Sequence, residues 1–128
     1  MKRILIVEDQ ADLRGILRDV LTGSGYLVVE AQNGEGGVAQ AKSELPDLIL
    51  MDIQLPVIDG YEATRQIRAD SNLKTIPIIA VSSYAMKGDE EKARASGCND
   101  YVTKPYSPIQ LLRIIRDFLG EKSWPRAE

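Results

Sequence analysis

The chain has 128 residues, of which 44% are hydrophobic and 27% charged, and its formal net charge is −3. This composition is typical of one globular domain and excludes a disordered or collagen-like chain. The acidic balance provides no positive field for phosphate backbones or anionic lipids, and no window has the apolar length that a bilayer span needs. We therefore expect a cytoplasmic protein that binds neither nucleic acid nor a membrane.

Histidine is absent, and Cys98 is the only cysteine. These counts exclude a Ser-His-Asp triad, a Cys-His pair and a His-ligated zinc site. They also exclude an internal disulfide, which fits a reducing compartment. We expect Cys98 to be a small buried residue rather than a reactive thiol.

Three apolar runs have no polar interruption, namely residues 4–7, 48–51 and 78–81. Unbroken runs of this length predict strands that are buried on both faces of a parallel sheet. Residues 27–29 and 101–102 form shorter or more polar segments, and they predict two edge strands.

Helical periodicity occupies the segments between these strands. In the first segment, large apolar side chains recur every three or four residues, at Leu13, Ile16, Leu17, Val20 and Leu21. A less regular helix is expected over residues 34–44, where Gly36 and Gly37 weaken the helical preference.

The later helices carry recognisable start signals. Asp59 and Glu62 fit a capping box at the start of the third helix. Ser107 and Pro108 combine a capping side chain with a proline in the first turn, so they predict the start of the last helix. The last helix carries a full apolar stripe, made of Leu111, Leu112, Ile115, Phe118 and Leu119.

The fourth helix, expected over residues 87–96, has a different character. It offers Ala93 and Ala95 but almost no large apolar side chain to bury, so we expect it to be weakly held. Close packing of small residues against the sheet is the alternative interpretation, and the sequence leaves both open.

Five strands that alternate with five helices predict an α/β fold. We expect a flavodoxin-like (βα)5 doubly wound parallel sheet with helices on both faces. Residues 1–120 form this single domain, and residues 121–128 are expected to be a flexible tail.

Polar residues cluster where the predicted strands end. Glu8 and Asp9 follow the first strand, Asp52 the third, Ser82 the fourth and Lys104 the fifth. The carboxyl ends of parallel strands share one edge of the sheet, so these side chains should converge there. Crowded carboxylates repel one another unless a cation joins them, and ligands that are all oxygen favour Mg²⁺.

This set of groups suits phosphoryl transfer. Lys104 supplies a positive charge and Ser82 a hydroxyl donor for the peripheral oxygens of a phosphoryl group. Asp52 ends a central buried strand and is the natural nucleophile, so the expected product is an aspartyl phosphate.

Four segments in this order resemble the receiver domain of bacterial two-component response regulators: residues 6–9, residues 51–60, residues 80–86 and residues 97–105. The resemblance runs from about residue 2 to residue 119, and residues 85–91 are most similar to stand-alone receivers of the DivK type. It implies the strand order 2-1-3-4-5. It also implies a signalling domain that catalyses only its own phosphorylation and dephosphorylation, not an enzyme that acts on external substrates.

The resemblance implies that Asp52 is the phosphoacceptor. The phosphoryl group would come from a phosphohistidine on a sensor histidine kinase or a histidine phosphotransfer protein. Mg²⁺ would be bound by Asp9, Asp52 and the backbone carbonyl of Gln54, with help from Glu8. The phosphoryl group would be bound by Lys104, Ser82 and Ser83.

Further roles follow from the same resemblance. Ser82 and Tyr101 correspond to the switch pair, and Pro105 corresponds to a cis-proline. Gln54 and Tyr84 would tune the rate of dephosphorylation. A downstream protein target would bind the face formed by the fourth helix, the fifth strand and the fifth helix, and a phosphorylation-dependent homodimer remains an open alternative.

Three rival interpretations fit the sequence less well than a receiver. Haloacid-dehalogenase phosphatases require a second acid at the position that Gln54 occupies here, so turnover of external phosphate esters is not expected. The glycines form no phosphate loop after the first strand, which argues against a flavin- or nucleotide-binding domain. A receiver that works without phosphate conflicts with the complete acidic set.

Overall fold

The computed structural model describes residues 1–83 and 88–120, so Tyr84 and the predicted tail at residues 121–128 lie outside the described residues. Its elements follow one another in the order β1 (Arg3–Val7), α1 (Ala11–Gly23), β2 (Leu27–Ala31), α2 (Gly34–Glu44), β3 (Leu48–Asp52), α3 (Gly60–Arg68), the 3₁₀ turn η1 (Ser71–Leu73), β4 (Ile78–Ser82), α4 (Asp89–Ser96), β5 (Asp100–Thr103) and α5 (Pro108–Phe118). The five strands are parallel and ordered β2-β1-β3-β4-β5. This architecture confirms the predicted flavodoxin-like, doubly wound sheet with strand order 2-1-3-4-5.

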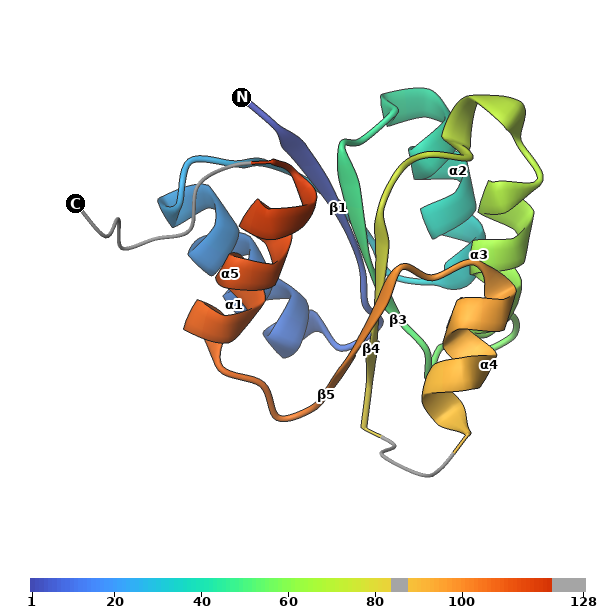
Figure 1. The fold of residues 1–128 in the computed structure, drawn as a ribbon. Coiled ribbons are helices and arrows are strands. Elements are labelled where there is room, and N and C mark those ends of the chain that lie inside the picture. The colour runs from blue at the N-terminus through green and yellow to red at the C-terminus, as the bar shows by residue number, and fades with distance from the viewer. Residues whose placement is uncertain (84–87, 121–128) are drawn as a thin grey trace.

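The sheet lies between two helical layers, with α1 and α5 on one face and α2, α3 and α4 on the other (Figure 1). Side chains of β1 alternate between the two cores: Leu5 and Val7 pack toward α2 and α3, while Ile4 and Ile6 pack toward α1 and α5. Both cores are apolar, so residues 4–7 of the strand carry no polar side chain. This is why the central strands read as unbroken apolar runs.

The glycines of α2 allow this helix to lie close to the sheet. A Cβ atom at Gly37 would come within 2.8 Å of a methyl carbon of Val7 in β1. The side chain of Asn33 compensates in part for the weak helical preference, because its oxygen accepts a 2.7 Å hydrogen bond from the backbone N–H of Gly36. Packing therefore overrides the local preference.

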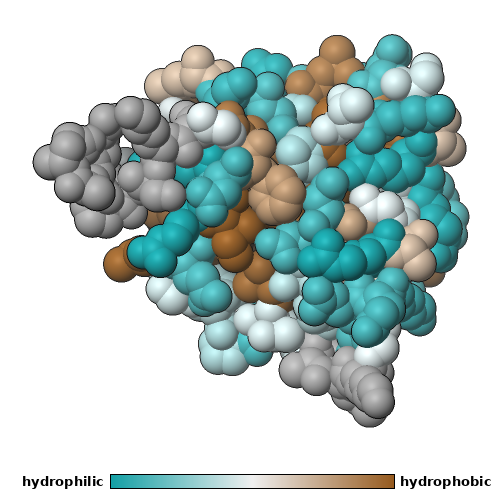
Figure 2. Space-filling view, viewed as in Figure 1, coloured by the Kyte–Doolittle hydropathy of each residue, from teal (hydrophilic) through white to brown (hydrophobic). Residues whose placement is uncertain are grey.

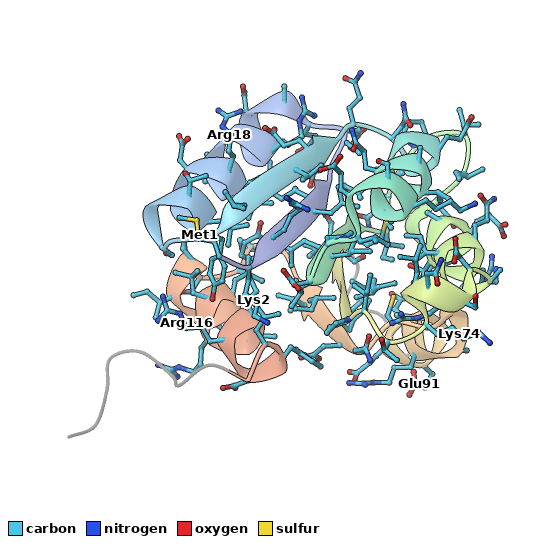
Figure 3. The ribbon with its side chains drawn as sticks, turned by 90° about the horizontal axis from the view of Figure 1, so that it is seen from above. Met1, Lys2, Arg18, Lys74, Glu91 and Arg116 are labelled. Atoms are coloured by element: carbon cyan, nitrogen blue, oxygen red, sulfur yellow. The ribbon has the colours of Figure 1, made fainter. Side chains whose placement is uncertain are left out.

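Two loop residues extend the sheet at its amino end, which Figure 3 views from above with Met1 and Lys2 labelled. Asp47 accepts from the backbone N–H of Arg3 (2.7 Å) and donates its own N–H to the Arg3 carbonyl (2.8 Å). Asn99 pairs with Ile78 in the same way, at 2.8 and 2.7 Å. Each loop side chain thus completes the hydrogen bonding of the neighbouring strand where that strand begins.

Arg68 closes the same end of the molecule. Its guanidinium donates to the side-chain oxygen of Asn99 and to four backbone carbonyls, those of Gly97, Leu73, Lys74 and Ile76. Because these acceptors belong to three separate segments, one half-buried side chain ties the end of α3 to η1, to the start of β4 and to the turn before β5.

The helices differ in how many of their side chains are buried. Of the residues in α4, only Ala93 and Ser96 are buried, and Ala95, expected to help pack the helix, is exposed. Leu111 and Ile115 of α5 are buried, and the Ser107 side chain caps its first turn. Ile16 departs from the predicted apolar stripe of α1 because its side chain is 57% exposed.

Cys98 is free and buried, as expected from the sequence. Half of the predicted capping box of α3 is present, since Asp59 accepts a 2.9 Å hydrogen bond from the backbone N–H of Glu62. The Glu62 side chain accepts from Arg65 and Gln66 instead. Within residues 1–83 and 88–120, no helix has the length and apolar character required to cross a bilayer.

Candidate functional site

The three predicted carboxylates meet at the carboxyl end of the sheet. Glu8 and Asp9 directly follow β1, and Asp52 is the last residue of β3, the neighbouring strand. One oxygen of each lies within 4.8 Å of the others. Glu8 and Asp52 are almost fully buried, at 2% and 3% exposure, whereas Asp9 is exposed. The group therefore has two buried members and one that faces solvent.

Lys104 brings a positive charge to the two buried carboxylates. Its Nζ atom lies 3.2 Å from Oε1 of Glu8 and 3.4 Å from Oδ2 of Asp52. The backbone holds Lys104 at this edge, because its N–H donates to the carbonyl of Ser82 at 2.7 Å. The peptide bond between Lys104 and Pro105 is cis, as expected.

The pKa of Glu8 reflects its burial beside a second carboxyl group. Burial, hydrogen bonding with the Asp52 carboxyl and the charge of Asp52 raise the pKa of Glu8 from 4.5 to about 7. The backbone N–H of Gln10 and the ammonium of Lys104 act in the opposite direction and do not cancel this rise. An additional cation would relieve the crowding. The all-oxygen donor set of Glu8, Asp9 and Asp52 fits Mg²⁺.

The Asp52 side chain is oriented by its own loop. Its Oδ1 atom accepts a 3.0 Å hydrogen bond from the backbone N–H of Gln54, while Oδ2 faces Lys104. Gly60 packs directly behind this turn, since its N–H donates to the Ile53 carbonyl at 3.0 Å and an added Cβ would collide with the Asp52 carbonyl oxygen. Only glycine fits there without moving Asp52.

The Gln54 side chain makes a contact that the sequence did not predict. Its Nε2 donates to Oγ of Ser82 at 2.8 Å, and its Oε1 accepts from the backbone N–H of Ser83 at 3.1 Å. We call this pair of hydrogen bonds the Gln54 bridge. It connects the loop after β3 to the end of β4, beside Asp52.

Two tyrosines lie near this edge. Tyr101, the predicted switch residue, is half-buried and packs against the core on the α2–α3–α4 side of the sheet. Tyr106 was not singled out from the sequence. Its hydroxyl is buried with no hydrogen-bond partner among the described residues, and burial, followed by the charges of Glu8 and Asp52, raises its pKa to about 12.

Two hollows flank the carboxylate cluster. One, of about 590 Å³, opens beside Asp9 and Gln54 and is also lined by Asp89 and Lys92 of α4. The other, of about 460 Å³, adjoins Lys104 and Tyr106 and runs along the apolar side chains of α1. Solvent and a partner can therefore approach the cluster from both sides.

The structure brings most of the sequence-predicted residues to one edge. Glu8, Asp52 and Lys104 are in direct contact, Asp9 lies close to them, and Gln54 contacts Ser82 and Ser83. Tyr101 lies near the start of β5, in the core on one face of the sheet. The carbonyl role of Gln54 and the role of Tyr84, which is outside the described residues, stay predictions.

Comparisons with known proteins agree with this geometry. Residues 4–116 match the family model described as the response regulator receiver domain. The polar-differentiation response regulator DivK of Brucella anthropi is 42% identical over 120 residues, which cover 94% of this chain and 98% of that protein.

Solved structures give the same result. The receiver domain of a sensor histidine kinase from Pseudomonas aeruginosa, solved with a magnesium ion coordinated in its active site cleft, is 40% identical with a TM-score of 0.87, and the match covers 94% of this chain and 98% of that one. A CheY-like receiver domain from Methanospirillum hungatei is 30% identical with a TM-score of 0.88, covering 94% of each chain. Over nearly its whole length, this chain belongs to the response regulator receiver domain family.

Proposed function

We propose that this receiver accepts a phosphoryl group on Asp52 in a Mg²⁺-dependent reaction in the cytoplasm. The donor is a phosphohistidine on a sensor histidine kinase or a histidine phosphotransfer protein, which supplies the imidazole that this chain lacks. The observation that carries the proposal is the convergence of Glu8, Asp9, Asp52 and Lys104 at one edge of the sheet.

The metal would be held by Asp9, Asp52 and the backbone carbonyl of Gln54, with Glu8 contributing directly or through water. When bound, Mg²⁺ supplies positive charge for the oxygens of the incoming group. The elevated pKa of Glu8 supports this assignment, because crowded carboxylates favour a cation in their midst.

The chain's own groups carry out the transfer. An oxygen of Asp52 forms the new bond to phosphorus while the bond from phosphorus to the partner's histidine nitrogen breaks, and the electron pair leaves with the imidazole. The Lys104 ammonium, already 3.4 Å from Asp52, pairs with the phosphoryl oxygens. The hydroxyl of Ser82 and the backbone N–H of Ser83 provide further donors.

Gln54 also separates this proposal from a phosphatase. A phosphatase that forms an aspartyl phosphate needs a second acid close to the nucleophile, and the amide of Gln54 neither gains nor loses a proton near neutral pH. We therefore propose a phosphoacceptor with no turnover of external phosphate esters. A steady-state assay with a generic phosphate ester tests this point, and sustained turnover would contradict it.

The central test is mass spectrometry after incubation with acetyl phosphate and Mg²⁺. The unmodified chain should gain one phosphoryl group, and Asp52→Asn should gain none. Asp59→Asn is a matched control, because Asp59 lies outside the carboxylate cluster and asparagine also caps a helix well. Equal phosphorylation of the Asp52→Asn variant would overturn the proposal.

The output face would consist of α4, β5 and α5, with Ser82 and Tyr101 as the switch pair. The view in Figure 2 shows hydrophobic side chains gathered over α5 beside β5, whereas the surface over α4 is mostly hydrophilic. Ile109 and Phe118 of α5 are exposed at 56% and 36%. This surface suits a downstream protein target, and a homodimer that forms on phosphorylation is the alternative occupant.

A switch requires an element that can move at low cost, and α4 meets that requirement because it buries so little. Amide hydrogen exchange should be faster over residues 89–96 than over residues 111–119. Equal protection of the two helices would contradict a loosely held α4.

Tyr84 concerns the lifetime of the aspartyl phosphate. We propose that its bulky side chain, together with Gln54, hinders the water that attacks phosphorus. Tyr84→Ala should therefore speed the loss of phosphate from Asp52 at fixed Mg²⁺, measured by the decay of the phosphorylated mass. An unchanged or slower decay would remove this role.

A further inference from the structure

The Gln54 bridge occupies groups that the phosphorylated state requires. Its Oε1 atom takes the backbone N–H of Ser83, and its Nε2 atom donates to Oγ of Ser82. Ser82 is only 1% exposed, so its hydroxyl has few alternative positions. In the unphosphorylated protein, a neutral amide therefore engages both the Ser83 N–H, as its donor, and the Ser82 hydroxyl oxygen, as its acceptor.

The amide oxygen of Gln54 and an oxygen of the incoming phosphoryl group are both hydrogen-bond acceptors. An amide carbonyl oxygen accepts from the Ser83 N–H as a phosphoryl oxygen would, but without the negative charge. Hydrogen bonds to an ionised acceptor are about twice as strong as those between neutral groups. A phosphoryl group on Asp52 can therefore displace the amide, whereas water or a weakly bound anion competes less well.

We propose that the Gln54 side chain is a positioning residue that restrains Ser82 and Ser83 until Asp52 is phosphorylated. This inference rests on the proposed function, because it assigns a role in the same site. Release of the amide removes this restraint from both serines, so that Ser82 can shift toward the phosphoryl group. The Gln54 bridge thus adds to the free energy that phosphorylation must supply before the end of β4 rearranges.

The test separates the hydrogen bonds from the bulk of the side chain. Gln54→Met keeps nearly the same length and volume but lacks both polar atoms, and Gln54→Ala removes bulk and polar atoms together. Neither variant alters the backbone carbonyl or the backbone N–H that contacts Asp52. A restraint made of hydrogen bonds is lost in both variants, whereas a steric restraint is lost in Gln54→Ala alone.

The first measurement is the affinity of beryllofluoride in the presence of Mg²⁺, determined by calorimetry. This tetrahedral anion mimics a phosphoryl group on a carboxylate, and its binding is independent of the water that hydrolyses an acyl phosphate. Because the net value of one hydrogen bond limits the gain, both variants should bind it roughly threefold to tenfold more tightly than the unmodified chain. Unchanged or weaker binding, or a gain in Gln54→Ala alone, would overturn the proposal.

The second measurement uses amide hydrogen exchange by NMR on the unphosphorylated protein without added ligand. Exchange at the Ser83 N–H should be faster in Gln54→Met than in the unmodified chain, while exchange in β1 should be unchanged. Equal exchange at Ser83 would show that the bridge does not protect this group and would overturn the inference.

The two measurements also distinguish this inference from the proposed function. If the unmodified chain binds no beryllofluoride with Mg²⁺, the phosphoacceptor role is wrong and the role of the bridge is lost with it. If the unmodified chain binds the anion and neither variant binds it more tightly, only the restraint by Gln54 is wrong.

Discussion

The two ends of the sheet differ in how their polar side chains are paired. At the amino end, polar side chains form hydrogen bonds with backbone groups of neighbouring segments, as those of Arg68, Asn99 and Asp47 do. Arg68 also donates to the side chain of Asn99. At the carboxyl end, Glu8 and Asp52 are buried side by side with Lys104 as the nearby cation, and Tyr106 has a buried hydroxyl without a partner among the described residues.

The difference separates groups that hold the fold from groups that do chemistry. Paired polar atoms stabilise the chain because the hydrogen bonds to their partners offset the free-energy cost of burying them. Crowded carboxylates destabilise the folded chain and at the same time create a site for a cation and a phosphoryl group. Substitutions of the paired residues at the amino end should therefore cost stability, and substitutions of Asp52 and Lys104 at the carboxyl end should cost function.

The largest expected effect is at the amino end. Arg68→Ala removes five hydrogen bonds that join three segments, and it leaves carbonyls such as that of Ile76 without this donor. The free energy of unfolding should fall by about 3 kcal/mol, measured by urea denaturation. Arg65→Ala is the matched control on the same helix, because Arg65 is exposed and pairs only with nearby Glu62 among the described residues, and it should cost less than about 0.5 kcal/mol.

The folded Arg68→Ala protein should still accept phosphate from acetyl phosphate. Loss of phosphorylation in a variant that remains folded would break the comparison, because the amino end would then contribute to the chemistry.

The second effect concerns Glu8 and has the opposite sign. Since folding raises the pKa of Glu8 from 4.5 to about 7, its stabilising contribution is full below pH 4.5 and is lost as the pH rises through 7. Glu8→Gln keeps the side chain neutral at every pH. Without divalent cations at pH 8, this variant should be about 2 to 3 kcal/mol more stable than the unmodified chain, and the two should be similar near pH 4.

Magnesium sharpens the same prediction. At pH 8, added Mg²⁺ should raise the midpoint of thermal unfolding of the unmodified chain more than that of Glu8→Gln, because a ligand stabilises the state that binds it. Equal shifts in both proteins would show that Glu8 takes no part in holding the cation.

The third effect concerns the unpartnered hydroxyl of Tyr106. Tyr106→Phe removes a buried polar atom and keeps the ring, so the free energy of unfolding should rise by about 1 kcal/mol in urea denaturation. Phosphorylation of Asp52 by acetyl phosphate should continue. A loss of stability would indicate that the hydroxyl has a partner, such as an ordered water, and that this part of the site is better satisfied than we infer.

The smallest effect lies in the loop after β3. Val57 has a φ of 70°, a conformation that is strained for a β-branched residue, and its side chain is 92% exposed. Val57→Gly relieves the strain but adds backbone entropy to the unfolded chain, so the net gain in stability should be about 0.5 kcal/mol. Thermal unfolding measures this gain, and destabilisation would show that the loop is not strained.

The sequence by itself determined the succession of strands and helices along the chain and the edge at which the site forms. Residues 48–51 read as a buried strand because both faces of β3 are covered, and the residue that follows such a strand must emerge at the carboxyl end of the sheet. Glu8, Asp9, Asp52 and Lys104 could be assigned to one site for this reason.

Only the tertiary structure decided which polar atoms pair. The Gln54 bridge joins residues 28 and 29 positions apart, Arg68 reaches three segments, and the Tyr106 hydroxyl is left over beside Glu8 and Asp52. Periodicity specifies which face of an element is buried, but it carries no information on side-chain rotamers or on distances between segments. Those distances depend on how closely the helices pack on the sheet, as Gly37 and Gly60 allow here.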